Sequence, residues 1–297
     1  MYLYSSKCLT QAKRAGIINK KAIEDLMSEY INLCVPSVMN YDIKYYFQDD
    51  YDTHPPRIWP LHVHDRMEIY VLLEGDVSFA VESTLYKLTP GDAIIIKPNE
   101  MHNCILDSES VHRHICFWVD ASCDFLFRDF LLHDFGKNNI VTPTDEAKEK
   151  LTEIYSRLKN ASLENDVHKQ FYLTLEMLDI FRGFISNDTA PVVLPELLQK
   201  ILTDIDSNFL SIKSLDYFVD KYYISNSTLN RLFRTHLHTT PKLYIETKRL
   251  ANSRLLLKSG KSVIDSCRES GFPDYSNYIR LFKKRFGTTP NQYKDGK

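Results

Sequence analysis

The spacing of hydrophobic positions changes twice along the chain. Between residues 41 and 120, short runs of β-branched and aromatic residues are separated by turn residues. The runs are IYVLL, VSFAVE, TLYKL, AIIIKP, HNCIL and HICFWV. Glu74-Gly75-Asp76 and Pro90-Gly91-Asp92 hold the residues that favour tight turns. Several short strands at this spacing predict a β-sandwich or a β-barrel.

Helical spacing predominates on both sides of the predicted strands. Val167, Phe171, Leu175 and Leu178 recur every three or four positions and form an apolar stripe. We expect this stripe to form a dimer seam, with packing against its own barrel as the alternative. The proline-containing stretch before residue 196 predicts a linker. We therefore divide the α+β chain into a helical extension (1–40), a β-barrel (41–144), helices (145–187), a linker (188–195) and a helical C-terminal domain (196–297).

The C-terminal domain contains an internal repeat. RLFRTHLHTTPKLYI begins at Arg231 and RLFKKRFGTTPNQYK begins at Arg280, 49 residues later. Arg, Leu, Phe, Thr-Thr-Pro and Tyr coincide in the two copies. Self-similarity at a fixed offset indicates one structural unit used twice.

Each copy has the anatomy of a helix-turn-helix. In the second copy, a short helix over 263–270 is followed by a turn at Gly271 and by a longer helix over 275–286 that Asp274 caps. In the first copy, helices over 215–221 and from 226 to about 236 flank Ser225 as the expected N-cap. A single helix, Pro241 to Lys258, joins the two copies. Paired helices with a basic second helix are typical of DNA-reading units.

The C-terminal domain also differs in charge from the rest of the chain. Residues 196–297 hold 18 Lys and Arg against 10 Asp and Glu, whereas residues 1–195 hold 19 against 29. A basic C-terminal domain indicates that this part meets a polyanion. No apolar run has the roughly 18 residues of a membrane helix, and the N-terminus lacks an apolar signal core. The six cysteines form no C-x-x-C pair, so we expect reduced thiols and a cytoplasmic protein.

The segment ESGFPDYSNYIRLFKKRFGTTPNQYK closely resembles the signature of the AraC/XylS family of transcription regulators. The resemblance covers about 85 residues from Ile212. It implies a C-terminal all-α domain with two helix-turn-helix units and double-stranded DNA as partner. Tyr223 departs from the pattern because it stands where the first unit usually has glycine. The DNA-contacting residues implied by position, charge and helix face are Ser227, Asn230, Arg231, Arg234, Tyr275, Ser276, Ile279, Arg280, Lys283 and Lys284.

Histidines and a glutamate recur on the predicted strands. His62, His64 and Glu68 follow an H-x-H-x3-E spacing, and His102 lies on a later strand. Side chains two apart share a strand face, so His62 and His64 point the same way. The pattern resembles the two motifs of cupins, which family members of the AraC type commonly carry as a β-barrel sensor. The second motif is degraded, with Glu100 in the place of a glycine and Leu106 in the place of an asparagine.

Three roles remain open for His62, His64, Glu68 and His102. They form a plausible ligand set for a divalent transition metal, or line a metal-free effector pocket, or have no ligand role. We favour the metal-free pocket, so no cofactor is expected. Trp59 and Tyr70 are further effector-binding candidates because their rings can stack on a sugar or an aromatic effector, as can Tyr86 and Trp118. His112 and His114 lack a carboxylate partner in this pattern and are interpreted as structural.

These observations favour a sequence-specific DNA-binding regulator whose N-terminal barrel binds a small-molecule effector. The sequence leaves both roles, activator and repressor, open. Sugars are among the candidate effectors, RNA polymerase is a candidate partner, and we expect a homodimer with no membrane partner. A metal-dependent cupin enzyme with a helical appendage is the alternative, but it would not require duplicated basic units. A constitutive nucleoid-type DNA binder would not explain the barrel. We therefore expect a protein that is not an enzyme.

Overall fold

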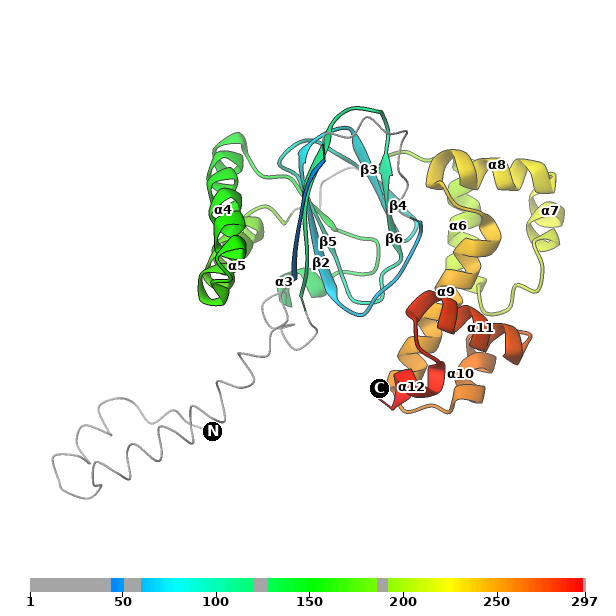
Figure 1. Ribbon diagram of the computed structural model, residues 1–297. Helices are drawn as coiled ribbons and strands as arrows, with labels where there is room; N and C mark the ends of the chain where they lie inside the picture. The colour runs from blue at the N-terminus through cyan, green and yellow to red at the C-terminus, as the bar shows by residue number, and fades with distance from the viewer. Residues whose placement is uncertain (1–43, 51–59, 120–127, 186–191, 296–297) are drawn as a thin grey trace, which may run out of the picture. The chain divides into compact units, whose positions relative to one another are not determined.

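The computed structural model describes residues 44–50, 60–119, 128–185 and 192–295 (Figure 1). The predicted extension over 1–40 and Trp59 lie outside these residues. Ile43–Lys297 forms one compact unit. It begins with strands, continues with a helical pair and ends in a helical domain, which confirms the α+β fold class. Among the described residues, no helix is both long and apolar enough to cross a membrane.

Two antiparallel sheets build the N-terminal domain. The larger sheet has the order β1 (Lys44–Asp50), β7 (His112–Val119), β2 (Met67–Glu74), β5 (Ala93–Ile96) and β8 (Ile140–Val141). The smaller sheet has the order β4 (Thr84–Leu88), β3 (Val77–Val81) and β6 (His102–Leu106). The predicted turns are where the sequence placed them, since Gly75 and Gly91 both have positive φ. At Gly75 a Cβ atom would lie 2.8 Å from the Val111 carbonyl oxygen, so the β2–β3 turn requires glycine.

The two faces of the smaller sheet belong to different hydrophobic cores. Phe79 of β3 and Cys104 of β6 pack with Tyr70 of the larger sheet in the barrel interior. Their strand neighbours Ala80 and Ile105 belong to a second core, made mainly of residues between Leu194 and Ile245. Alternation along a strand sends successive side chains to opposite faces. The smaller sheet is therefore a wall with buried side chains on both sides.

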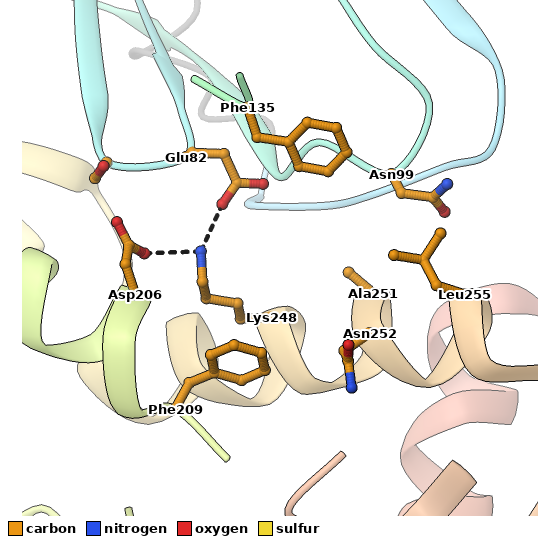
Figure 2. Close-up of a pocket in the computed structure, with 10 residues that line it drawn as sticks. Glu82, Asn99, Phe135, Asp206, Phe209, Lys248, Ala251, Asn252 and Leu255 are labelled. Atoms are coloured by element: carbon orange, nitrogen blue, oxygen red, sulfur yellow. Dashed lines mark hydrogen bonds and ion pairs between the residues drawn. The ribbon is translucent and has the colours of Figure 1, made fainter. Parts of the chain in front are cut away.

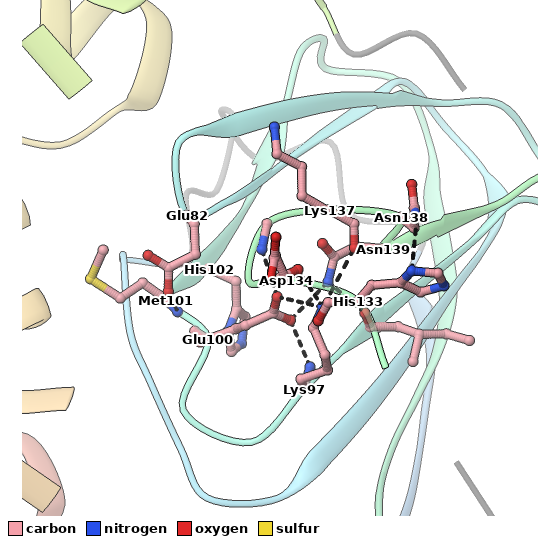
Figure 3. A network of polar contacts seen from close by, with 12 residues as sticks. Glu82, Lys97, Glu100, Met101, His102, His133, Asp134, Lys137, Asn138 and Asn139 are labelled. Atoms are coloured by element: carbon pink, nitrogen blue, oxygen red, sulfur yellow. Dashed lines mark hydrogen bonds and ion pairs between the residues drawn. The ribbon is translucent and has the colours of Figure 1, made fainter. Parts of the chain in front are cut away.

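Glu100 explains why the second cupin motif departs from the usual pattern (Figure 3). Its carboxylate is fully buried and accepts hydrogen bonds from the backbone N–H groups of Lys97 and Gly136 and from the Asn139 amide. The Lys97 ammonium lies 3.2 Å from Glu100 and also donates to the carbonyls of His133 and Asp134. A buried carboxylate requires partners of this kind to offset its desolvation. Glu100 thus fastens the loop over residues 133–139 to the barrel.

A helical hairpin follows the short helix α3 (Arg128–Leu131) and strand β8. Helix α4 (Asp145–Leu163) is capped by Thr144, and helix α5 (Val167–Arg182) by Asp166. Of the predicted apolar stripe, Leu178 is fully buried, whereas Val167 is 66% exposed. Phe171 and Leu175 are half-buried. The stripe is therefore divided, and Leu178 belongs to the interior of this chain.

The C-terminal domain holds both predicted helix-turn-helix units. Its helices are α6 (Glu196–Asn208), α7 (Asp216–Tyr222), α8 (Asn226–Leu237), α9 (Pro241–Lys258), α10 (Val263–Glu269), α11 (Tyr275–Phe286) and α12 (Pro290–Lys294). Ser225 accepts a hydrogen bond from the Thr228 N–H, and Asp274 accepts one from the Asn277 N–H, as expected for N-caps. Tyr223 has a φ of 52°, so it adopts the left-handed conformation that explains the usual glycine at this place.

Candidate functional site

The histidines and the glutamate singled out in the sequence converge inside the barrel. One nitrogen or oxygen from each of His62, His64, Glu68 and His102 lies within 4.8 Å of the others. The His64 Nε2 atom is 2.8 Å from the Glu68 carboxylate, and the His102 Nε2 atom is 3.5 Å from it. His62 reaches the group because residue 62 pairs with residue 102 through two backbone hydrogen bonds of 3.0 Å. We refer to these four side chains as the histidine cluster.

The backbone fixes how each imidazole ring of the histidine cluster is oriented. The Nδ1 atom of His62 lies 3.0 Å from the Pro60 carbonyl oxygen. That of His64 lies 3.0 Å from the Arg66 carbonyl oxygen, and that of His102 lies 2.9 Å from the Glu100 carbonyl oxygen. A carbonyl can only accept, so each Nδ1 atom carries the hydrogen. The Nε2 atoms are thereby directed into the cluster, as in metal sites where a backbone carbonyl orients the ligand.

Glu68 is the centre of the polar contacts in the barrel. Besides the histidines, it accepts hydrogen bonds from the Trp118 indole N–H at 2.7 Å and from the Cys116 thiol at 3.3 Å. Burial alone would raise the pKa of Glu68, but the hydrogen bonds from His102 and His64 hold it well below its usual value. Burial lowers the pKa of His62 to about 3, assisted by the neighbouring His102. The site therefore contains a buried carboxylate beside a neutral imidazole.

A cavity of about 180 Å³ adjoins the histidine cluster. Its lining residues are His62, Glu68, Tyr70, Phe79, Cys104, His114, Cys116 and Trp118. The strand register accounts for this set, because Glu68 pairs with Trp118, Tyr70 with Cys116, and Phe79 with Cys104. Burial raises the pKa of the Cys104 thiol to about 12, so this thiol is uncharged. Among the described residues, the lining includes no lysine or arginine.

The structure places the remaining aromatic and histidine candidates in different positions. Tyr70 and Trp118 line the cavity, whereas Tyr86 donates its hydroxyl hydrogen bond to the Gly136 carbonyl and lies outside the lining set. His114 lines the cavity, although the sequence interpretation treated it as structural. His112 is 2.6 Å from the Tyr70 hydroxyl. Sequence reasoning also missed Phe79, Cys104 and Cys116, which only the pairing register between strands could have revealed.

The second helices of the two units present equivalent polar faces. Ser227, Asn230, Arg231 and Arg234 of α8 recur at helical spacing on one face. The same positions 49 residues later in α11 are Ser276, Ile279, Arg280 and Lys283. All of these are exposed except Asn230 and Ile279, which are half-buried, and the flanking Tyr275 and Lys284 are exposed too. On the opposite faces, Leu229, Phe233, Tyr278 and Phe282 are buried.

Local hydrogen bonds orient some of these side chains. The Asn230 amide donates to the Asn226 carbonyl at 2.8 Å, and the Arg280 guanidinium donates to the Asn277 side chain at 2.7 Å. Arg280 therefore keeps most of its five N–H donors available at the protein surface. An exposed guanidinium group on such a helix can donate two hydrogen bonds to the edge of a guanine.

Two protein families match the two halves of the chain. The AraC-like ligand binding domain matches residues 48–174, and a helix-turn-helix domain matches residues 218–296. The HTH-type transcriptional activator RhaR of Escherichia coli (strain K12) is 22% identical over 256 residues. That alignment covers 82% of this chain and 89% of RhaR. RhaR of Shigella dysenteriae serotype 1 matches with the same identity and coverage.

Solved structures also resemble the chain. ToxT from Vibrio cholerae O395 has 14% identity and a TM-score of 0.33, over 86% of this chain and 98% of that chain. A probable AraC family transcriptional regulator from Rhodopseudomonas palustris CGA009 has 17% identity and a TM-score of 0.32. It aligns with 34% of this chain and 97% of its own length.

The burial of His114 predicts a stability that depends on pH. Burial, together with His112, lowers the pKa of His114 from 6.5 to about 3. Between these values the unfolded chain binds a proton that the folded chain does not, so stability is complete above pH 6.5 and falls as the pH falls toward 3. We expect His114→Gln to reduce the loss of unfolding free energy between pH 7 and pH 5 by about 2 kcal/mol. Urea denaturation at both pH values measures the free energy of unfolding. His168→Gln, which replaces an exposed histidine, is the control. Equal losses in the wild type and His114→Gln would contradict the assignment.

Proposed function

The chain belongs to the AraC family of transcription regulators and is a DNA-binding regulator with an N-terminal ligand-binding domain. From that premise we propose which of its residues bind DNA and which bind an effector. The exposed faces of α8 and α11 read DNA bases, and the barrel cavity binds a small effector. The observation that carries the first assignment is the equivalence of Ser227, Arg231 and Arg234 with Ser276, Arg280 and Lys283. We propose binding, not catalysis, as the task of the cavity.

The proposed DNA contacts divide into base readers and phosphate binders. Arg231 and Arg280 occupy the same place in the two units, and a guanidinium can bind guanine with two hydrogen bonds. Arg234, Lys283 and Lys284 lie toward the ends of their helices, and cations there hold phosphates without reading sequence. Because one helix, α9, joins the units, they are expected to enter successive major grooves about 34 Å apart.

Arg231→Ala and Arg280→Ala should each weaken binding to the specific site by about 1–3 kcal/mol and relax base preference at separate positions. Binding is measured by gel retardation of the full chain on a duplex selected from a random pool, against a scrambled duplex. Arg268→Ala, which removes an exposed arginine on α10, is the matched control and should leave discrimination unchanged. If either reading-helix variant retains wild-type discrimination, its arginine does not read a base.

The chemistry of the cavity indicates the class of effector. Glu68 supplies a carboxylate, and His62 a neutral ring, whereas the lining within the described residues offers no side-chain cation. A ligand that donates hydrogen bonds or carries a positive charge is favoured there, and an anionic ligand is disfavoured. The volume of about 180 Å³ is below the ~300 Å³ of sites for drug-sized ligands. A small polyhydroxylated metabolite such as a sugar fits these conditions.

A divalent transition metal is the second candidate for the histidine cluster. Three imidazoles whose Nδ1 atoms are engaged by carbonyls, with a carboxylate among their Nε2 atoms, fit a metal that prefers nitrogen and oxygen ligands. His64, Glu68, His62 and His102 would then hold the ion, which would supply a Lewis-acidic anchor for the effector.

Elemental analysis of the full chain, purified without a histidine tag, distinguishes these candidates. We expect metal content near zero, and a sugar panel should contain a compound that raises the melting temperature because it binds the native state. His64→Ala should then weaken that stabilisation while leaving DNA affinity in the absence of ligand unchanged. Manganese, iron, nickel or zinc near one per chain, lost in His64→Ala, would instead establish the metal candidate.

A dimer seam is proposed on the exposed part of helix α5. Val167 is 66% exposed, and Phe171 and Leu175, one and two turns later, are half-buried. Tyr172 is 58% exposed beside them. A row of apolar side chains at this spacing can pack against the same row of a second copy, as two-fold dimers do. Leu178 is left out of the seam because it is buried in its own chain.

Val167→Asp should shift the full chain from dimer to monomer at micromolar concentration, because it places a charge on the most exposed apolar residue of the proposed seam. Light scattering measures the mass. Val193→Asp, an equally apolar position that is 86% exposed outside the hairpin, is the control and should leave the dimer intact. A wild-type chain that is monomeric throughout this concentration range would contradict the seam.

A further inference from the structure

The second helices of the two units, α8 and α11, present matching positions to solvent. Over residues 226–236 and 275–285, each residue is buried, half-buried or exposed just as the residue 49 positions away is. Three exposed positions also carry the same chemistry, because both helices have serine at the second position, arginine at the sixth and a cation at the ninth. The remaining positions of this face are where the two units can recognise different bases.

The clearest difference on this shared face is between Asn230 and Ile279. Both side chains are half-buried, and each stands immediately before the arginine that the two helices share. Asn230 carries an amide with two donor hydrogens and an acceptor oxygen, whereas Ile279 carries a branched hydrocarbon with neither. One helical turn earlier, Asn226 of α8 is another amide and Tyr275 of α11 is an aromatic ring. The first helix therefore presents amides where the second presents apolar surface.

The amide of Asn230 is oriented in a way that suits adenine. Its Nδ2 atom donates one hydrogen bond to the Asn226 carbonyl at 2.8 Å, and this bond uses one of the two amide hydrogens. In the major groove, adenine offers an acceptor at N7 beside a donor at its N6 amino group. The second amide hydrogen can bond to N7 while the Oδ1 atom accepts from the amino group. Guanine offers two acceptors there, so one amide oxygen would have no donor to bind.

The side chain of Ile279 suits the other base of an A·T pair. It packs partly against the core that contains Tyr278 and Phe282, and its remaining surface is open to solvent. A β-branched side chain in a helix has one strongly preferred rotamer, so this open surface keeps its position. In the major groove, thymine displays an apolar C5-methyl group. Contact between Ile279 and that methyl group removes apolar surface of both from water.

Helix α9 fixes the two reading helices relative to each other. Its first turn belongs to the core of the first unit through Tyr244, and its middle belongs to the core of the second unit through Leu250. Figure 2 shows the Lys248 ammonium of α9 with the Asp206 carboxylate of α6 at 2.7 Å and the Glu82 carboxylate at 2.8 Å. Because one packed helix belongs to both units, each unit keeps its own half-site. An altered base in one half-site can therefore be assigned to one reading helix.

We propose that the two units recognise A·T base pairs by different chemistry. Asn230 binds the edge of an adenine in the first half-site, and Ile279 packs against the methyl group of a thymine in the second. The inference rests on the proposed DNA-reading role of α8 and α11 and names the bases that these helices meet. Each A·T pair lies in the same half-site as the guanine that the shared arginine binds. One half-site is thus recognised through hydrogen bonds at this pair, and the other through an apolar contact.

The first experiment changes the DNA and leaves the protein as it is. A duplex selected by the full chain from a random pool has its A·T pairs altered one at a time, and Arg231→Ala and Arg280→Ala assign its half-sites to the two units. 7-Deazaadenine carries a carbon in place of N7 and should lower affinity about tenfold at one position of the first half-site. Uracil lacks the methyl group of thymine and should lower affinity about fourfold at one position of the second half-site.

The second experiment connects each response to one side chain. Asn230→Ala should lose the response to 7-deazaadenine and keep the response to uracil, and Ile279→Ala should do the reverse. Asn230→Ile copies the second unit and should gain a response to uracil in the first half-site. Ile264→Ala, which removes an exposed isoleucine on α10, is the matched control and should keep both responses. Each response is a ratio of two affinities measured with one protein, so a variant with less folded protein gives the same ratio.

The outcomes separate this inference from the proposed function. If both half-sites respond alike to the two analogues, or if neither responds, the two units do not use different chemistry. A response to 7-deazaadenine that persists in Asn230→Ala, or a response to uracil that persists in Ile279→Ala, would overturn the assignment of that residue. A wild-type chain that selects no duplex, or that keeps its full discrimination in both arginine variants, would instead overturn the DNA-reading role of α8 and α11.

Discussion

The structure depends on the small sheet having two buried faces. A strand can direct only alternate side chains to one side, so Phe79 and Cys104 reach the barrel interior while Ala80 and Ile105 reach the core shared with the C-terminal helices. A sheet with one solvated face would carry polar residues at every second position. Here the apolar residues of that face are buried in the core of the C-terminal helices, so the small sheet lies between two hydrophobic cores.

Within the barrel, the buried carboxylate of Glu68 determines the chemistry. It is 5% exposed, and its desolvation is offset by His64, His102, Trp118 and Cys116 together. Removal of any one partner would leave the others in place, but removal of Glu68 would leave several buried donors without an acceptor. In the effector pocket that we propose, the same carboxylate would favour ligands that donate hydrogen bonds. Glu100 has a separate, structural task, since its partners are loop N–H groups and Lys97.

The two helix-turn-helix units have the same local structure at their second helices. Both second helices begin at an N-cap side chain, Ser225 or Asp274, and both end at a residue with positive φ, His238 or Gly287. The difference lies in their surroundings. The first unit shares its core with the barrel through Phe218 and its neighbours, whereas the core of the second unit is made from its own helices and α9. The barrel contacts the second unit and α9 through ion pairs of Asp65 with Arg254 and Lys258 and through a hydrogen bond from Arg285 to the Leu61 carbonyl.

The sequence by itself determined the elements and the family. Some signals act over a few neighbouring residues, so they can be recognised from the sequence without the fold. They are the turn residues Gly75 and Gly91, the N-caps Ser225 and Asp274, and the repeat that begins at Arg231 and Arg280. The H-x-H-x3-E spacing indicated that His62, His64 and Glu68 belong together, because strand alternation is also local.

Only the tertiary structure decided which strands lie side by side. Cys104, Cys116 and His114 line the cavity because strands far apart in the chain pair with each other. Leu178 is not part of the exposed apolar stripe because it is buried within its own chain. The contacts of Asp65 and Glu82 with α9 span more than a hundred and sixty residues, so no local pattern records them. Register and long-range packing depend on which surfaces meet, and that is settled by the free energy of the whole fold.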